Sequence, residues 1–409
     1  MRLPRPHHCV LPLLAGSAAL APGALALEAR DVLQFSAGPL TLRPQFGVAE
    51  SFDSNVFFLA PPREEADFVS VFSPGLKVGL GGQGKPLAIN LTFSHDESIY
   101  ARLDSLNHAD DRILLTSSYQ GAKFQVTGSD SFSFLSGPLG SYSLLTVGGA
   151  APLALSVDHN YIIDGYRFDY NLSDKTFVAL GASHTGVDYQ QGLPLYDYQS
   201  FRGAGDFGYK PFSKISFFGE VYYQYIATHP NFYAPPTTPV TSVGLFLGLK
   251  GDFTSKLSGT LQFGYEQRDY GSNFKSSGTP VAQIDLSYDP SPKRRITFSY
   301  SRVSTVAVES GSTSLTLDQI SLRLNQNIGT QDRFSVQLGA NVRSADYETL
   351  GTGGSRNDVY FMIDAGVFYK FYGWLAGSLS VQHEVYLPGT KGLVDYDANR
   401  VTLKLTAGY

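Results

Sequence analysis

The sequence lacks the features on which several classes of protein depend. Among 409 residues the only cysteine is Cys9, so the rest of the chain has neither disulfides nor cysteine metal sites. Charged residues make up only 16% of the chain, and beyond the N-terminus no apolar run reaches the roughly 18 residues of a membrane-spanning helix. The net charge of −5 argues against a general nucleic-acid binder, so we expect no nucleic-acid partner.

Aromatic residues and glycine are abundant instead. The chain holds 42 Gly, 25 Tyr and 28 Phe, which is too apolar and aromatic for a disordered protein. Residues 1–26 combine Arg2 and Arg5, a short apolar run and the small-residue sequence Ala24-Leu25-Ala26. This order predicts a cleaved secretory signal peptide, followed by a short periplasmic segment over 27–38. A buried N-terminal helix is the alternative interpretation.

Short turn sequences recur about every 40 residues, with one longer interval. They contain the Gly, Pro, Asn and Asp of tight hairpins. The eight turns begin at Gly81, Gln120, Leu172, Lys210, Asp252, Asp289, Asn327 and Tyr369. Longer polar connections, such as "ATHPNFYAPPTTP", lie between them. Short turns that alternate with long loops are typical of outer-membrane barrels, and the pattern differs from the single recurring unit of a solenoid.

The segments between the turns alternate apolar and polar residues. In "KLSGTLQFGYEQR", Leu257, Leu261, Phe263 and Tyr265 fall on one face of a strand. Such segments run for about 10 to 14 residues, whereas sandwich strands average about 5 to 6 and a tilted membrane strand needs about 9 to 11. We therefore expect an all-β fold, a transmembrane antiparallel β-barrel over 39–409 in the bacterial outer membrane. Eight hairpins plus the first and last strands give about 18 strands, with 16 or 20 as alternatives.

The chain closes with "RVTLKLTAGY", a strand that ends at an aromatic residue. Leu403, Leu405 and Tyr409 lie on its apolar face, in a pattern that resembles the signal read by the barrel assembly machinery. We expect this strand to pair with the first one, so that no backbone edge faces the lipid of the outer membrane.

With the apolar face of each strand towards lipid, the opposite face lines the interior. The expected pore-lining residues are Arg43, Lys77, Asp96, Arg112, Arg167, Asp169, Arg202, Asp206, Glu220, Lys250, Glu266, Arg268, Asp285, Arg323, Arg343, Asp364, Glu384 and Lys404. A polar, charged interior predicts a water-filled lumen or a polar plug. Basic residues spread over many strands favour anionic solutes. The alternative is that these charges neutralise one another in ion-pair ladders.

The third outer loop, Leu135 to Asp158, is rich in Gly, Ala and Leu, unlike the other loops. We expect it to fold into the barrel and narrow the pore, with extension of the flanking strands as the alternative.

Catalytic patterns are nearly absent. "HDES" offers His95 and Ser98, but alternation places His95 on the lipid side, and His184 and His383 are isolated. Neither a nucleophile elbow nor a pair of metal ligands at suitable spacing occurs. We therefore expect no catalytic residue, metal or cofactor, and a barrel enzyme acting on lipid stays an alternative.

The stretch from Leu42 to Leu80 resembles the opening of the putative beta-barrel porin-2 family. The likeness rests on Asp53, Asn55 and Phe57, followed by "SPGL" from Ser73. Members often accompany genes for exopolysaccharide synthesis and export. The resemblance therefore implies a role in passing polysaccharide through the outer membrane. We expect a pore for polysaccharide or another polar solute, with a periplasmic polysaccharide-export protein as a candidate partner at the short-turn side. A general diffusion porin for small solutes, including anionic ones, is the first alternative, and a surface-binding protein that uses its outer loops is a further one.

Overall fold

The computed structural model describes residues 33–82, 84–138, 157–189, 196–230, 239–271, 276–306, 314–329, 332–348, 356–389 and 395–408. The strands are β1 (Phe35–Ala37), β2 (Leu40–Asp53), β3 (Asp67–Gly81), β4 (Leu87–Tyr100), β5 (His108–Gln120), β6 (Phe124–Leu135), β7 (His159–Asn171), β8 (Thr176–Tyr189), β9 (Tyr196–Tyr209), β10 (Ile215–Pro230), β11 (Val240–Asp252), β12 (Leu257–Asp269), β13 (Ser277–Ser291), β14 (Arg294–Val306), β15 (Ser314–Ile328), β16 (Phe334–Glu348), β17 (Arg356–Lys370), β18 (Leu375–Leu387) and β19 (Tyr396–Ala407). One 3-10 turn, η1 (Asp104–Leu106), precedes β5. No helix in these ranges is long and apolar enough to cross a membrane.

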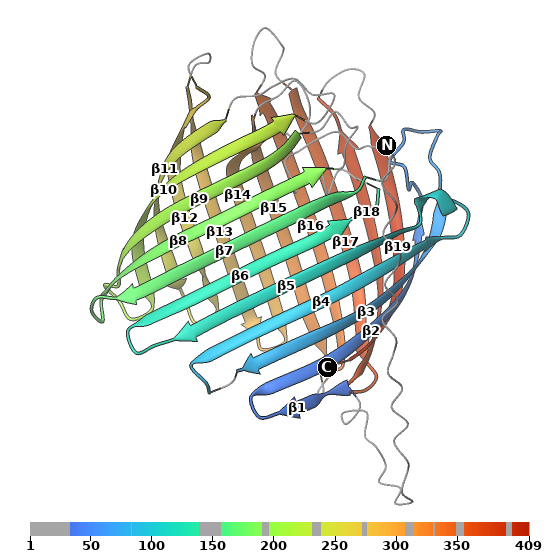
Figure 1. Ribbon diagram of the computed structural model, residues 1–409, viewed down its shortest axis with the longest axis horizontal. Coiled ribbons are helices and arrows are strands. Elements are labelled where there is room, and N and C mark those ends of the chain that lie inside the picture. The colour runs from blue at the N-terminus through green and yellow to red at the C-terminus, as the bar shows by residue number, and fades with distance from the viewer. Residues whose placement is uncertain are drawn as a thin grey trace, which may run out of the picture.

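Strands β2 to β19 form a closed antiparallel barrel. Each pairs with the strand before and after it, and β19 pairs with β2 to close the ring. The barrel therefore has 18 strands, as the spacing of the turns predicts, and the strands tilt strongly around its wall (Figure 1). The short β1 pairs alongside the first residues of β2, where Phe35 lies opposite Leu42.

The two ends of the barrel differ in the length of their connections. At one end, which we call the turn end, eight turns of two to five residues join the strands at the predicted positions. At the other, the loop end, nine connections of six to 23 residues join them. Because short turns are periplasmic in outer-membrane barrels, the turn end corresponds to the periplasmic side.

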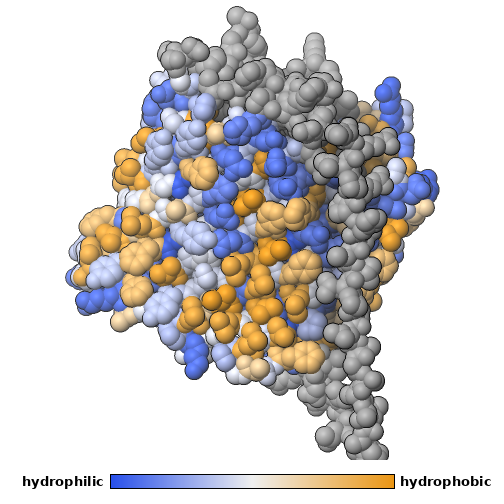
Figure 2. All heavy atoms as spheres, viewed as in Figure 1, coloured by the Kyte–Doolittle hydropathy of each residue, from blue (hydrophilic) through white to orange (hydrophobic). Residues whose placement is uncertain are grey.

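One face of each strand is predominantly apolar and lies on the outside of the barrel. Phe207 is 57% exposed, Val221 56%, Leu247 64% and Phe263 57%. Directly paired residues share a face of the sheet, so the register carries this outward row from strand to strand, as where Leu247 lies opposite Phe263. Figure 2 shows a broad hydrophobic area on the lower part of the visible wall, with hydrophilic residues towards the loop end. The alternate residues of each strand therefore face the lumen.

The seam between β2 and β19 closes by backbone pairing and by side-chain contacts within the lumen. The ladder runs from Arg400 opposite Asp53 to Ala407 opposite Phe46. Arg400 Nη2 lies 2.5 Å from Asp53 Oδ2, which ties the two strands together at the loop end. On the outer face of β19, Leu403 is exposed.

The expected assembly signal as a whole stays a prediction. Leu405 is exposed like Leu403. Tyr409, its terminal residue, lies outside the described residues.

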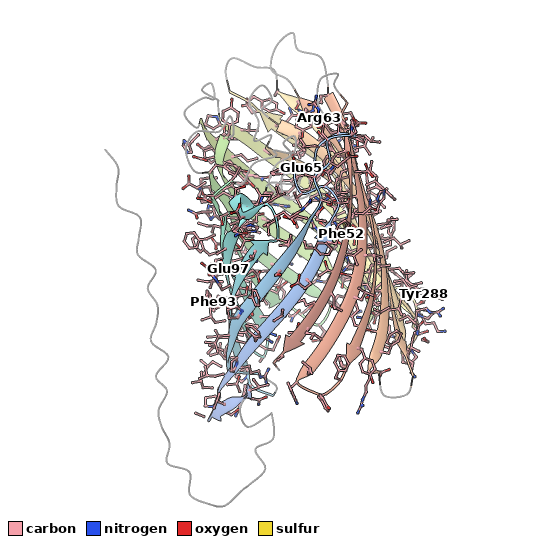
Figure 3. The ribbon with its side chains drawn as sticks, turned by 90° about the vertical axis from the view of Figure 1, so that its right-hand side faces the viewer. Phe52, Arg63, Glu65, Phe93, Glu97 and Tyr288 are labelled. Atoms are coloured by element: carbon pink, nitrogen blue, oxygen red, sulfur yellow. The ribbon has the colours of Figure 1, made fainter. Side chains whose placement is uncertain are left out.

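The connection between β2 and β3, residues 54–66, folds into the barrel. Asn55 is fully buried, and its Nδ2 donates to Leu59 O at 2.8 Å and to Asp397 O at 2.9 Å. Its Oδ1 accepts from Leu59 N at 2.9 Å. These bonds direct Phe58 against the ring of Tyr396 on β19, with centroids 5.1 Å apart. Figure 3 shows Arg63 and Glu65 of the same connection at the loop end, above Glu97 and Phe93.

The expected inward fold of the loop from Leu135 to Asp158 stays a prediction. Residues 139–156 lie outside the described residues. In the connection between β2 and β3, Asn55, Val56 and Phe58 are buried, and Phe58 packs within the lumen.

We predict that Asn55→Ala loosens this segment. Losing the buried amide leaves backbone groups of Leu59 and Asp397 without partners, at a cost of about 1–3 kcal/mol. Because local opening exposes the segment to protease, tryptic cleavage after Arg63 should become at least about fivefold faster in the refolded barrel. Asn90→Ala, an exposed asparagine on β4, is the matched control. Equal cleavage rates in the two variants would contradict this account.

Candidate functional site: the barrel lumen

The register places all of the expected pore-lining residues on the inward face of their strands. Directly paired residues lie on the same face of the sheet, so each inward residue identifies its partner as inward. Examples are Arg202 opposite Gln224, Asp206 opposite Glu220, and Lys77 opposite Arg43. That they line a conducting pore stays a prediction.

A network of charges runs across the inner wall from β7 to β12. Arg167 Nη2 lies 2.5 Å from Asp206 Oδ2, and its Nε lies 3.1 Å from Asp169 Oδ1. One strand further on, Arg202 pairs with Glu220.

The same network continues through an aromatic ring. The Arg202 guanidinium also covers the ring of Tyr222 at 3.9 Å. Tyr222 then donates its hydroxyl to Glu266 Oε2 at 2.7 Å, and Glu266 pairs with Arg268 at 2.8 Å. Each arginine of the network thus meets a carboxylate, and the aromatic ring of Tyr222 links the two halves.

Ion pairs recur on the remaining wall. Arg112 bonds to Asp96 at 2.5 Å and to Asp110 at 2.8 Å. Arg323 lies 4.0 Å from Asp364 on β17. This arrangement agrees with the alternative interpretation that the inward charges neutralise one another in ion-pair ladders. A neutralised pair contributes little electric field to the lumen.

Three inward cations lie near the turn end of the seam. Arg43 and Lys77 face each other across β2 and β3, and the Lys404 side chain passes over Gly47 of β2. We call Arg43, Lys77 and Lys404 the seam cluster. Within the described ranges none of the three has an ion-pair partner, so their charge acts on the lumen without a local counter-charge.

A polar pocket occupies the middle of the inner wall and encloses about 390 Å³. Its inward lining comprises Thr127, Ser129, Gly165, Arg167, Gly181, Ser183, Arg202, Ala204, Glu220, Gln262 and Gln283. Gln262 donates to Gln283 Oε1 at 3.1 Å, and Gln283 donates to Asp285 Oδ2 at 2.9 Å. A Cβ at Gly165 would have no neighbour within 4 Å, so the wall there is open. Hydroxyls, amides and charged groups therefore surround one hollow.

Nearer the loop end the lumen is packed with aromatic side chains. The cluster contains Phe58, Leu315, Leu317, Ala345, Tyr347, Tyr360, Tyr386, Tyr396 and Ala398, all buried. The Tyr360 hydroxyl donates to Glu384 Oε2 at 3.0 Å, so the expected lumen residue Glu384 lies within this packing. Sequence analysis missed the cluster. The available signal was a tyrosine at an inward position near the loop end of β16, β17, β18 and β19 in turn.

The histidines considered in the sequence face outwards, as alternation indicates for His95. His95 Nδ1 lies 2.8 Å from Asp111 Oδ1, and its Nε2 lies 3.5 Å from Glu97 Oε2. His184 Nδ1 lies 2.9 Å from Asp164 Oδ2. In the part of the chain described by the structure, no group of three or more His, Cys, Asp or Glu is placed to hold a metal ion.

Comparison with known proteins gives a family and several distant structural likenesses. The family model described as putative beta-barrel porin 2 matches residues 240–409, which include β11 to β19. The match supports the resemblance, although it lies outside the stretch from Leu42 to Leu80 that first indicated it. No curated protein matches the chain. By its fold and this match, the chain is a porin-like outer-membrane β-barrel.

Solved structures with a similar barrel include OpdO of Pseudomonas aeruginosa, at 11% identity and a TM-score of 0.47, covering 90% of this chain and 97% of that one. OpdK of Pseudomonas aeruginosa with vanillate has 9% identity and a TM-score of 0.47, covering 90% and 99%. The siderophore receptor PirA of Pseudomonas aeruginosa has 9% identity and a TM-score of 0.43, covering 90% and 80%. Likenesses at this level say nothing about the solute.

We predict that the double variant Lys77→Glu, Lys404→Glu shifts ion selectivity towards cations. The two unpaired cations would become anions, so the anion-to-cation permeability ratio should fall about threefold or more. The measurement is the reversal potential of the refolded barrel in a planar bilayer under a salt gradient.

Lys85→Glu, in the turn between β3 and β4, makes one such charge reversal outside the lumen. Near 1 M salt the Debye length is about 3 Å, so this control should leave the ratio almost unchanged. A ratio unaltered in the double variant would show that the seam cluster does not border the ion path.

Proposed function

We propose that this porin-like barrel passes a polysaccharide across the outer membrane. The observation that carries the proposal is the polar pocket, where hydroxyl, amide and charged side chains from β6 to β13 face one hollow. Sugar rings present hydroxyl donors and acceptors in every direction, and side chains such as Gln262 and Gln283 match both roles. Direct and water-mediated hydrogen bonds of this kind exchange easily, which suits passage rather than capture.

The charge arrangement supports an acidic polysaccharide. Paired charges on the inner wall give it polarity without a strong net field, whereas the seam cluster adds three unpaired cations near the turn end. A polyanion that arrives from the periplasm would meet these cations before it reaches the polar pocket. Electrostatic attraction at this point raises the local concentration of the polymer. A periplasmic polysaccharide-export protein that delivers the polymer to the turn end fits the same arrangement.

A general diffusion porin is the second candidate, and the hydrophilic wall favours it equally. The two differ in what the packed aromatic cluster at the loop end implies. Phe58 and the tyrosines around it occupy part of the cross-section of the lumen. A diffusion pore needs a constantly open path, whereas a pore for a polymer tolerates a segment that moves aside for its cargo.

We predict that acidic oligosaccharides added at the turn end block the current through the barrel in discrete events. The double variant Gln262→Ala, Gln283→Ala should shorten the blocked time about tenfold. That change corresponds to about 1.4 kcal/mol, the combined loss of two exposed hydrogen-bonding groups. Gln267→Ala, on the outward face of β12, is the matched control and should leave the blocked time unchanged.

The outcome decides between the two candidates. Free passage of small neutral sugars in a vesicle-swelling assay, with no blockade by oligosaccharides, would favour the diffusion porin. Blockade that is equal in the wild type and the double variant would remove the polar pocket from the path.

A further inference from the structure

Two hollows lie on the lipid-facing side of β9 and β10, and we call them together the groove. Three outward glycines lie along it: Gly203 and Gly205 on β9, and Gly219 on β10 opposite Phe207. A Cβ at Gly203 would meet nothing within 4 Å, and at Gly205 or Gly219 it would meet atoms at ordinary contact distances of 3.5 to 3.9 Å. None of the three has the positive φ that requires glycine. The fold does not need glycine at these positions, so their effect is to leave the groove open.

The part of the groove nearer the loop end combines aromatic rings with carboxylates. This upper hollow, of about 710 Å³, is bordered by Asp130, Asp164, Tyr166, Ala182, Ser183, His184, Phe201, Arg202, Gly203, Tyr223 and Tyr225. Asp130 and Asp164 lie directly opposite each other on β6 and β7. Tyr166 donates its hydroxyl to Asp130, and His184 pairs with Asp164 at 2.9 Å. Each carboxylate keeps acceptor positions towards the hollow, since an ionised carboxylate has about four.

The part nearer the turn end is apolar. This lower hollow, of about 580 Å³, is bordered by Phe207, Tyr209, Phe217, Phe218, Gly219, Leu247, Gly248, Leu249, Leu261 and Phe263. The outward rings are well exposed, with Phe207 at 57% and Phe217 at 48%. Gly205 lies between the two hollows along β9, since Gly203 borders the upper one and Phe207 the lower one. A molecule that lies in the groove therefore meets polar groups at one end and only hydrocarbon and aromatic rings at the other.

The groove has the depth of one lipid leaflet. From Phe201 to Phe207 the strand advances six residues, about 20 Å at 3.3 Å each. With a tilt of about 45°, this is roughly 14 Å along the membrane normal, close to half of the roughly 30 Å hydrocarbon layer. The polar end points to the loop end, so the matching lipid belongs to the outer leaflet.

Other charged groups face outwards near the loop end, where Arg302 lies 2.6 Å from Asp318 and His95 lies 2.8 Å from Asp111. A charged group that faces lipid costs up to about 2–4 kcal/mol near the midplane and less near the interface. Carboxylates at this position are tolerated most easily where a polar headgroup solvates them.

We infer that this groove binds an outer-leaflet glycolipid, with the sugar headgroup in the upper hollow and an acyl chain in the lower one. Sugar hydroxyls donate to Asp130 and Asp164, and the sugar ring packs against Phe201, Tyr223 or Tyr225. A phosphate headgroup is disfavoured, because two carboxylates face it and only His184 offers a compensating positive charge among the outward groups. The site lies outside the lumen and is independent of the proposed transport.

Native mass spectrometry of the refolded protein in a polyoxyethylene detergent tests this inference. Three synthetic lipids with the same two myristoyl chains serve as probes, with a glucose, a phosphate or an ethanolamine headgroup. We expect the glucose lipid to be retained about tenfold better than the phosphate lipid. Gly203→Leu fills the upper hollow and Gly219→Leu the lower one, so each should reduce retention of the glucose lipid about tenfold.

Ala365→Leu adds the same volume to the outward face of β17 and should leave retention unchanged. Asp164→Asn keeps the shape of the upper hollow and removes one charge. It should weaken retention of the glucose lipid and strengthen that of the phosphate lipid, so it tests the site even if a leucine variant fails to fold.

Equal retention of all three lipids would overturn the assignment to a sugar headgroup. Loss of retention in Ala365→Leu as well would overturn the location. A stable dimer or trimer of the wild type that Gly203→Leu converts to monomer, with no lipid retained, would show that a second copy of the chain covers this face instead.

Discussion

The structure depends first on the backbone hydrogen bonds of strands within hydrocarbon. A peptide group without a partner costs several kcal/mol there, so a sheet in lipid must close on itself. Here the barrel closes by the pairing of β19 with β2, and the Arg400–Asp53 ion pair reinforces the loop end of that seam. At the turn end the ladder stops at Ala407 opposite Phe46, and β1 covers the first residues of β2 beyond that point. A wall without a free edge then fixes the position of every other side chain.

Closure also gives each strand two unlike surroundings, and the period of two distributes residues between them. Val221 and Leu247 face the lipid, while the neighbouring Glu220 and Phe246 face inwards. A slip of one residue would exchange the two sets, so the register is strongly specified. The inward charges then meet partners across adjacent strands, as Arg202 meets Glu220. Ion pairs of this kind make the inner wall of the barrel polar and hydrated, and they limit the net electric field in the lumen.

The sequence predicted the features that depend on local chemistry. Gly, Pro and Asp in the turns marked all eight short hairpins, and alternation between them assigned residues such as Arg167 and Glu266 to the inward face. Features that depend on which strands become neighbours could not be predicted. Phe58 reaches Tyr396 only because the ring brings β19 beside β2, and no local pattern records that contact. The outward hollows likewise depend on the register of β9 and β10, which places Gly203 opposite Tyr223 and Gly219 opposite Phe207.

Three zones follow one another along the lumen, and their order has a physical consequence. The seam cluster lies near the turn end, the polar pocket lies in the middle of the wall, and the aromatic cluster around Phe58 fills part of the loop end. Under the proposed function, a polysaccharide that moves outwards would first be attracted by charge, then exchange hydrogen bonds, and last meet the packing around Phe58. The first two zones need no movement of the wall. In the third zone Phe58 comes from the connection 54–66, which the Asn55 amide anchors, whereas the other members of the cluster lie on β15 to β19. A closed hydrogen-bonded ring cannot widen without breaking its own ladder, so under the proposed function the part of this zone that can move is the connection that carries Phe58.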